Sequence, residues 1–195
     1  MKLLSFFLGF LISGFVPLSS AVMAADTPSY PHKKMLFFSK SSGFEHGVVK
    51  RTNGQPSFLD KLLTELGAKN NIEFVCSKDG SLFSKEYLAQ FDAFLFYATG
   101  DLTEAGDDGN PPMSPQGKQA LLDAVAGGKG FVGVHSAADA FHGYATRDMG
   151  PKRWHVDPEH ADPFIKMVGC EFIKHDNEAT ASLIIADPKF PGISA

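Results

Sequence analysis

Residues 35–38, Met35-Leu36-Phe37-Phe38, form a continuous apolar run between a polar leader and a polar turn. Such a run is typical of a strand that is covered on both faces of a parallel sheet. Apolar residues at helical spacing follow over residues 58–66, and Gly67 is expected to end that helix. A second apolar run, Ile72–Cys76, comes next. The helix-length connection predicts that these two strands are parallel.

The same alternation of strands and helices continues along the chain. We expect further strands at residues 92–97, 130–134, 171–173 and 181–186, and helices at residues 85–91, 114–127 and 164–168. Ser84 and Ser114 are the expected N-caps of the first two of these helices. This alternation predicts an α/β fold with a doubly wound, mostly parallel sheet of the flavodoxin-like kind.

Composition and charge exclude several classes of protein. Hydrophobic residues make up 44% of the chain and charged residues 21%, which is typical of a globular protein and not of a disordered one. The chain has 18 basic and 22 acidic residues, so its net charge is −4. Because the chain has no basic excess to hold a phosphate backbone, nucleic-acid binding is excluded as its main role.

The first 24 residues have the pattern of a secretory signal. Lys2 precedes an apolar run, and small residues ending at Ala24 follow. We therefore expect residues 1–24 to be removed, residues 25–33 to form a short leader, and residues 34–195 to form the functional domain. The mature protein is expected to be exported, to the periplasm or the extracellular space, without stable membrane insertion. An uncleaved membrane anchor is the alternative.

The two cysteines, Cys76 and Cys170, lie on different expected elements. An oxidising compartment would permit a disulfide between them, but no pattern in the sequence brings the two elements together. Two buried free thiols are the favoured interpretation.

Three loops at the carboxyl ends of the expected strands carry polar or titratable residues. Residues 43–46 follow the first strand, residues 99–101 the third and residues 135–139 the fourth. In doubly wound sheets the functional crevice lies beyond these strand ends. We therefore expect His46, Asp101 and His135 to converge at one rim and to be the catalytic residues.

The segment from Gly133 to Ala137 has the setting of a nucleophile elbow, since a strand leads directly into a turn of small residues. The elbow position is occupied by His135, which suits acid/base work or metal ligation. The alternative is a buried histidine bonded to a carbonyl group, with Ser136 as an N-cap.

Two further groups of residues contain side chains that can bind metal ions. His46, His135 and His175 are candidate ligands for a divalent metal such as zinc, although they lack a close-spaced ligand motif. The acidic run at residues 107–110 resembles part of a calcium loop, but the remaining ligands are missing, so a solvated loop is expected there.

Several of these motifs resemble those of the ThuA-like (trehalose utilisation) family. Residues 37–46 resemble its opening strand and Gly-Phe-x-His loop, and residues 92–102 resemble its third strand with the Thr-Gly-Asp turn. Residues 127–139 are similar to its most specific signature, and residues 169–175 resemble its Gly-x-x-Phe-x-x-His segment. The resemblance covers residues 34–195.

The resemblance implies a fold like that of the class I glutamine amidotransferases and a role in the metabolism of trehalose, related disaccharides or keto-sugars. Glutamine amidotransferase activity is not expected, because those enzymes carry cysteine where this chain has His135. A small-molecule carbohydrate is the expected partner, and the oligomeric state is open. A non-catalytic sugar-binding module on the same fold is the alternative. The expected substrate-binding residues are Gly43, Phe44, Glu45, Thr99, Gly100, Ser136, Asp139 and Trp154.

The chain departs from the family pattern near its C-terminus. It has Phe190-Pro191 where the family often has His-Pro, and family members usually continue further. We therefore expect the domain to be incomplete at its C-terminus.

Overall fold

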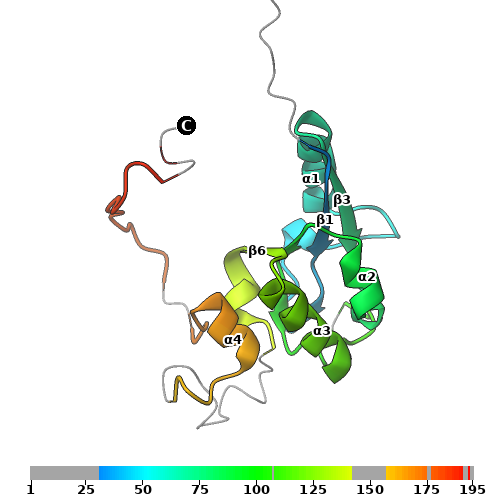
Figure 1. Cartoon of the computed structure of the whole chain (residues 1–195). Coiled ribbons are helices and arrows are strands. Elements are labelled where there is room, and N and C mark those ends of the chain that lie inside the picture. The colour runs from blue at the N-terminus through cyan, green and yellow to red at the C-terminus, as the bar shows by residue number, and fades with distance from the viewer. Residues whose placement is uncertain (1–30, 107, 142–156, 175–176, 191–192, 194–195) are drawn as a thin grey trace, which may run out of the picture.

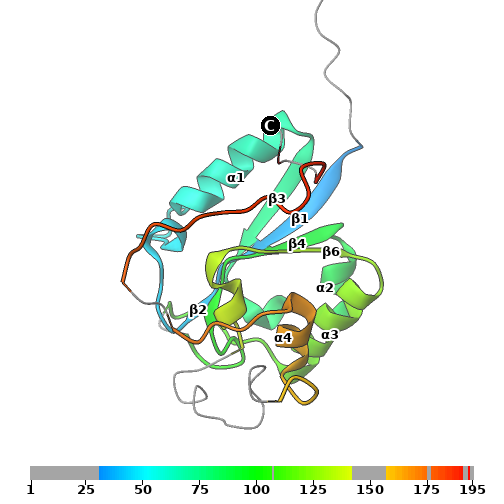
Figure 2. The same ribbon diagram turned by 90° about the vertical axis from the view of Figure 1, so that its left-hand side faces the viewer.

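Four parallel strands form the main sheet, in the order β3-β1-β4-β6 (Figures 1 and 2). Their bounds are β1 Lys33–Phe38, β3 Ile72–Ser77, β4 Ala93–Phe96 and β6 Gly130–Gly133. The computed structural model describes residues 31–106, 108–141, 157–174, 177–190 and 193. The four strands expected in this region are confirmed, and so is their flavodoxin-like order.

The two faces of the sheet bury different sets of side chains, because neighbouring residues of a strand point to opposite faces. Leu36 and Phe38 of β1 belong to one hydrophobic cluster, and Phe37 between them belongs to another. Helix α1 (Phe58–Lys69) packs on the Phe37 face through Leu59 and Leu63.

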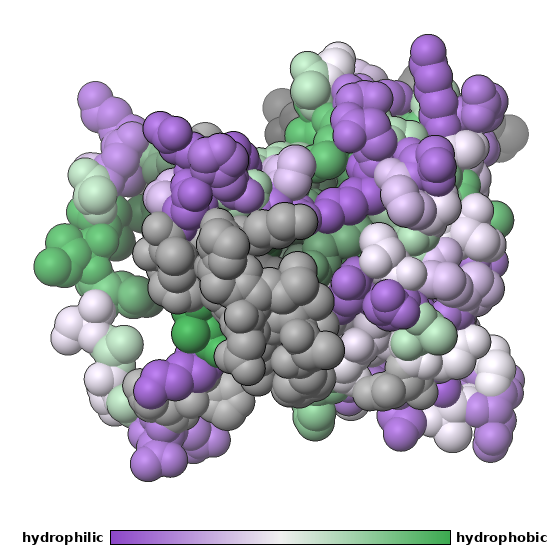
Figure 3. Space-filling view, turned by 90° about the horizontal axis from the view of Figure 1, so that it is seen from below, coloured by the Kyte–Doolittle hydropathy of each residue, from purple (hydrophilic) through white to green (hydrophobic). Residues whose placement is uncertain are grey.

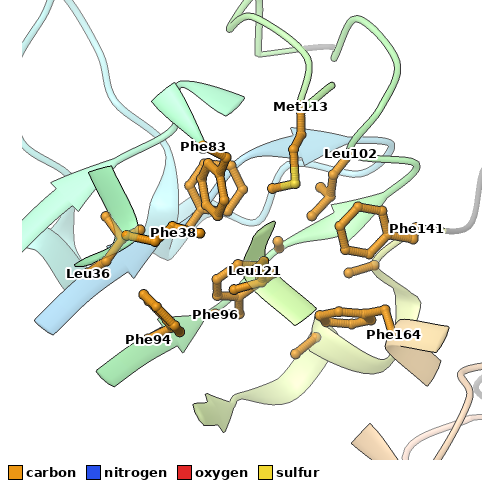
Figure 4. Packing of buried hydrophobic residues seen from close by; sticks show 14 of the residues in the cluster. Leu36, Phe38, Phe83, Phe94, Phe96, Leu102, Met113, Leu121, Phe141 and Phe164 are labelled. Atoms are coloured by element: carbon orange, nitrogen blue, oxygen red, sulfur yellow. The ribbon is translucent and has the colours of Figure 1, made fainter. Parts of the chain in front are cut away.

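The opposite face is covered by two other helices, α2 (Lys85–Ala89) and α3 (Pro115–Ala126). Their residues Leu88 and Leu121 are fully buried in the larger cluster. Figure 4 shows its aromatic and aliphatic side chains packed between sheet and helices, among them Phe94 and Phe96 of β4. Helices on both faces confirm the doubly wound α/β fold.

Short elements complete the described chain. They are β2 Ser41–Ser42, β5 Thr99–Gly100, the 3-10 helices η1 Gly47–Val49, η2 Gly80–Leu82 and η3 His135–Asp139, and α4 Pro163–Val168. Strands β2 and β5 pair with each other in a small parallel sheet at the carboxyl ends of β1 and β4.

The expected N-caps are confirmed. The Ser84 hydroxyl accepts a hydrogen bond from the Tyr87 amide, and the Ser114 hydroxyl accepts one from the Gly117 amide. Helix α1 begins with a capping box, in which the side chains of Ser57 and Asp60 each accept a hydrogen bond from the other residue's backbone amide.

The expected end of helix α1 was wrong. The helix continues past Gly67 to Lys69, and the chain turns at Asn71, which has a positive φ of 57°. Gly67 is needed for close packing: a Cβ atom there would lie 2.3 Å from the carbonyl oxygen of Ile72 and 2.8 Å from the ring of Phe74.

The strands expected at residues 171–173 and 181–186 are not formed. Both segments lie in the described part of the chain, where they make no strand pairing. In Figure 1 the C-terminal segment runs apart from the sheet, and Leu183 and Ile184 are more than nine-tenths exposed. Figure 3 shows hydrophobic side chains at the margin where this segment lies. An apolar run has strand character only where a neighbouring edge accepts its hydrogen bonds.

The remaining expectations concern the N-terminal signal, membrane insertion and the two cysteines. The expected signal at residues 1–24 lies outside the described residues. None of the described helices has the length and hydropathy needed to cross a bilayer. Cys76 and Cys170 are free thiols as expected, but the expectation that both are buried was wrong, because Cys76 is half-buried and Cys170 is exposed.

We predict that Gly67→Ala destabilises the fold by about 1–3 kcal/mol, because the added methyl group must displace backbone at Ile72. Alanine's better helix propensity is worth only about 1 kcal/mol and does not offset this clash. Denaturant unfolding measures the change, with Gly47→Ala as the control, since a Cβ atom at Gly47 meets nothing within 4 Å. Equal stability of the two variants would contradict the packing argument.

Candidate functional site

Three loops at the carboxyl ends of β1, β4 and β6 are joined by backbone hydrogen bonds. The pairing of β2 with β5 joins the first two loops. A parallel bridge between Gly100 and Ala140, with a hydrogen bond from the Phe141 amide to the Gly100 carbonyl, joins the third. The Thr99 hydroxyl donates to the Phe44 carbonyl at 2.8 Å. The three loops chosen from the sequence therefore share one rim.

Two predicted catalytic residues, His46 and His135, are in contact at this rim. Their ring centroids lie 4.7 Å apart, and the rings are close to perpendicular at 85°. The ring of Tyr97, which directly follows β4, lies 5.4 Å from His46 and 5.3 Å from His135. The ring of Phe44 lies 4.9 Å from that of His46. We call Phe44, His46, Tyr97 and His135 the ring cluster.

His135 has a strained backbone. Its φ is +51°, in the left-handed region that residues with a Cβ atom rarely adopt, and it begins η3 directly after the β6 strand. A sharp strand-to-helix turn with such a residue at its apex is the geometry of a nucleophile elbow. The His135 side chain is exposed at the rim, in agreement with the expected elbow and not with a buried histidine.

Burial sets the protonation of two members of the ring cluster. Desolvation, and then the charge of neighbouring His135, lower the pKa of His46, so its imidazole is neutral at pH 7. Desolvation also raises the pKa of Tyr97, so its phenol keeps its proton. The rim therefore presents a neutral imidazole beside a protonated phenol.

Asp101, the third predicted catalytic residue, lies on the rim but outside the ring contacts. Its Oδ1 atom accepts hydrogen bonds from the amide and the hydroxyl of Thr103, at 2.9 and 2.6 Å. The other carboxylate oxygen, Oδ2, makes no hydrogen bond to any described residue.

The predicted substrate-binding residues divide into two groups. Thr99, Gly43 and Gly100 are buried and hold the loops together; Gly100 has φ +74°, and a Cβ atom there would lie 2.4 Å from the Ser42 carbonyl oxygen. Phe44, by contrast, has a ring that is 62% exposed. It is the exposed apolar surface beside the histidine pair.

The remaining predicted contacts lie on η3, on the first loop or outside the described chain. Ser136 has a buried hydroxyl without a partner among the described residues, and Asp139 is half-buried at the end of η3. Oε1 of Glu45 forms an ion pair with the Lys78 ammonium group at 3.0 Å, so this oxygen is already bonded within the protein. Trp154 and His175 lie outside the described residues.

A metal centre is not assembled from described residues. They contain no group of three or more His, Cys, Asp and Glu side chains placed to hold an ion. His46 and His135 could supply two nitrogen ligands. The third candidate, His175, lies outside the described residues, so the zinc interpretation stays a prediction.

A buried ion cluster supports the loop that carries His46. It consists of Lys40, Lys78, Asp108 and Glu45, and the side chains of the first three are at most 2% exposed. Asp108 lies 3.6 Å from the Lys40 ammonium nitrogen and 3.4 Å from that of Lys78, and it accepts a hydrogen bond from the Ser41 amide at 2.8 Å. The two ammonium groups also donate to backbone carbonyls, at 2.7 and 2.9 Å.

The charges in this cluster stabilise one another. Burial lowers the pKa of Lys40, and the Asp108 carboxylate opposes that effect. For Asp108, burial raises the pKa, but hydrogen bonds from Ser41 and Asn110 and the charge of Lys78 outweigh it, so the pKa is lowered overall. Asp108 therefore stays ionised between two cations.

The sequence interpretation of this acidic run was wrong, because Asp108 is buried and not solvated. A short acidic run rich in glycine reads as a surface loop, and its burial depends on two lysines 30 and 68 residues away in the chain. The sequence predicts Tyr97 as the last residue of a buried strand and gives it no place in the site. Its place at a strand's carboxyl end was the available signal.

Neither cysteine offers a nucleophile at this rim. Cys76 lies on β3 on the α1 side, and burial raises the pKa of its thiol to about 12. A thiol with that pKa is protonated and unreactive at neutral pH. Cys170 is exposed, after α4.

We predict that Asp108→Asn lowers the free energy of unfolding by about 3–5 kcal/mol, because it leaves two buried ammonium groups without their shared counter-ion. Thermal or denaturant unfolding measures the loss. Glu73→Gln is the matched control, since it breaks an exposed pair with Lys34 that is worth about 0–1 kcal/mol. If both variants lose the same stability, the ion cluster is not what supports the loop.

Comparisons with known proteins agree with the fold and the motifs. Residues 34–194 match the ThuA family, described as trehalose utilisation. A search of curated proteins and a search of solved structures gave no significant match. The match covers most of the chain, includes all four strands of the sheet and contains every described residue of the rim. The chain therefore belongs to the ThuA family, whose description indicates a role in trehalose utilisation.

Proposed function

We propose that this protein is an exported enzyme that acts on trehalose, a related disaccharide or a keto-sugar by acid/base chemistry. The observation that carries the proposal is the contact of His46 with His135 at the carboxyl edge of the sheet, with His135 on a strained turn. Strained residues of this kind cluster at functional sites, where the surrounding structure holds them in place. The family supplies the carbohydrate part of the proposal.

An imidazole pair suits proton transfer next to a carbonyl group. Histidine can take up or release a proton near neutral pH, and a neutral imidazole is a competent base. The lowered pKa of His46 keeps its imidazole unprotonated at neutral pH, so this ring is able to accept a proton. His135 is exposed on its turn and is therefore accessible to a substrate at the rim.

The surroundings suit an uncharged, hydroxyl-rich ligand. Both lysines near the first loop, Lys40 and Lys78, are buried and paired, so neither offers its charge to a substrate anion. The exposed ring of Phe44 can stack on the apolar face of a sugar. Oδ2 of Asp101 is a hydrogen-bond acceptor for a sugar hydroxyl, in keeping with a role in the site.

A sugar-binding module without turnover is the second candidate. The observation that favours it is the exposed Phe44 ring, because an aromatic face beside hydrogen-bonding groups is sufficient for binding. Saturable turnover of a keto-disaccharide separates the two functions.

Export is supported by the N-terminal pattern of Lys2, an apolar run and small residues up to Ala24. N-terminal sequencing of the mature protein tests it. We expect the first residue to be Ala25 or a close neighbour, and an intact Met1 on membrane-bound protein would refute it.

We predict that His135→Gly and His135→Gln each lower kcat on a panel of 3-keto-disaccharides by about 100-fold or more, since the acid/base group is lost. Both variants are expected to stay within about 1 kcal/mol of the natural protein in stability, because glycine relieves the positive φ and glutamine keeps the volume. Steady-state kinetics and thermal melting on the same samples check this.

His32→Gln is the matched control, because His32 is exposed beside Asn71, at the opposite end of β1. Its turnover should be unchanged. If His135 is instead only a packing residue, its replacement leaves turnover intact and lowers stability by about 1–3 kcal/mol.

A further inference from the structure

We propose that Tyr97 is a third catalytic residue of this site, whose hydroxyl group donates a proton to the substrate oxygen while the histidine pair acts on the adjacent carbon. The inference deepens the proposed function and rests on it. It begins from the ring cluster, in which Tyr97 contacts both imidazoles at almost equal distances, 5.4 and 5.3 Å.

The position of Tyr97 is set by the sheet. Its amide donates to the Phe38 carbonyl at 3.0 Å, so β4 holds the residue in register with the end of β1. Its ring lies on the α1 face of the sheet, in the small cluster with Phe37 and Val49. Only 9% of the residue is exposed, so the ring has one defined place between core and rim.

Packing alone does not require a hydroxyl group at this position. The neighbours in the small cluster are apolar, and the chain uses phenylalanine 18 times and tyrosine 4 times. A phenylalanine at residue 97 would fill the same space. Within the described part of the chain the hydroxyl has no hydrogen-bond partner, and it is not one of the fully buried polar atoms that lack one. A ligand at the rim is the partner that this hydroxyl fits.

The histidine pair and Tyr97 together supply the base and the acid needed to convert a keto-sugar to its enol. An imidazole nitrogen takes a proton from the carbon next to the carbonyl of a keto-sugar, and the C–H bond breaks. Its electron pair forms a carbon–carbon double bond, and the carbonyl π electrons move to oxygen. The phenol O–H bond breaks as its proton passes to that oxygen, giving an enol. The proton that the imidazole holds then passes to the phenolate, which restores the phenol and the neutral imidazole. The net change is from ketone to enol, so no oxidant, reductant or co-reactant is consumed.

Tyr97 suits this step because desolvation raises the pKa of its phenol, so the phenol carries its proton at neutral pH and is a hydrogen-bond donor there. Stabilising a developing oxyanion by one positioned donor is worth about 10²–10³ in rate. Without Tyr97, the two imidazoles would have to take a proton from carbon and donate another proton to oxygen in the same step. With Tyr97 as the acid, the imidazoles need to act only as the base.

The test compares Tyr97→Phe with Tyr87→Phe, each of which removes one hydroxyl oxygen. Tyr87 lies on α2, against Phe91, and packs on the opposite face of the sheet from Tyr97. The substrates are 3-keto-disaccharides, with 3-ketotrehalose first. We expect kcat of Tyr97→Phe to fall about 100-fold with KM changed by less than about threefold. Tyr87→Phe should stay within about twofold, and both variants should melt as the natural protein does.

A second measurement uses no turnover. The full chain is labelled with ¹³C at the ζ-carbon of its four tyrosines, and 3-ketotrehalose or trehalose is titrated in. The Tyr97 signal should shift on binding and the Tyr87 signal should not. The signals of Tyr30, Tyr87 and Tyr144 are assigned by their own phenylalanine variants, so the measurement holds even if Tyr97→Phe fails to fold.

The outcomes separate the inference from the proposed function. If the natural protein turns over a keto-disaccharide and Tyr97→Phe keeps kcat within threefold, the role of Tyr97 is overturned and the proposed function stands. If no keto-disaccharide is turned over but the Tyr97 signal shifts, the catalytic role is overturned and the sugar-binding alternative gains. If there is neither turnover nor a shift, both proposals fail.

Discussion

Parallel pairing of β4 with β1 on one side and with β6 on the other is the constraint on which the site depends. Parallel strands place all their carboxyl ends at one edge, so the loops that follow them must meet there. The register places Phe96 opposite both Phe38 and Gly133, so these loops leave the sheet at the same height. The second pairing, between β2 and β5, continues this register beyond the main sheet.

Charges buried below the rim hold the first of these loops in place. Lysine and aspartate are almost never fully buried unless they are paired, because each charge loses its hydration. Here Asp108 lies between Lys40 and Lys78, and the same Lys78 reaches Glu45, next to His46. The network thus joins the loop after β1 to the long loop after β5. Replacing one charge would leave others unpaired, so the cluster acts as a unit.

At the end of β4, adjacent residues belong to the hydrophobic core and to the ring cluster. Phe96 and Tyr97 are neighbours in sequence, yet Phe96 lies in the larger core and Tyr97 beside two histidines. Alternation along the strand sends them to opposite faces. At the same edge His135 carries a strained φ, which costs stability on the order of 1–3 kcal/mol and is tolerated where function requires the direction of a side chain. The rim therefore combines a rigid base of buried strands with a few residues that are not optimal for folding.

The strand–helix alternation, the parallel sheet and its order were predictable from the sequence, because hydrophobic period, caps and crossover length are local signals. The meeting of His46 with His135 followed from the same topology. Three features were not predictable. The first is the continuation of helix α1 through Gly67. A glycine is required there for close packing against Ile72, not as the C-cap of the helix.

The burial of Asp108 could not be predicted, because its partners Lys40 and Lys78 are distant in the chain. The apolar run at residues 181–186 forms no strand, because a strand needs an edge to pair with. Local patterns in the sequence predicted the four strands of the main sheet, the helices between them and the loops that share an edge, but also two strands that do not form. Which side chains touch at that edge depends on the tertiary structure, which adds Tyr97 to the site and leaves Asp101 outside the ring contacts. The physical reason is that periodicity and propensity act over a few residues, whereas contact and burial depend on partners far apart in the chain.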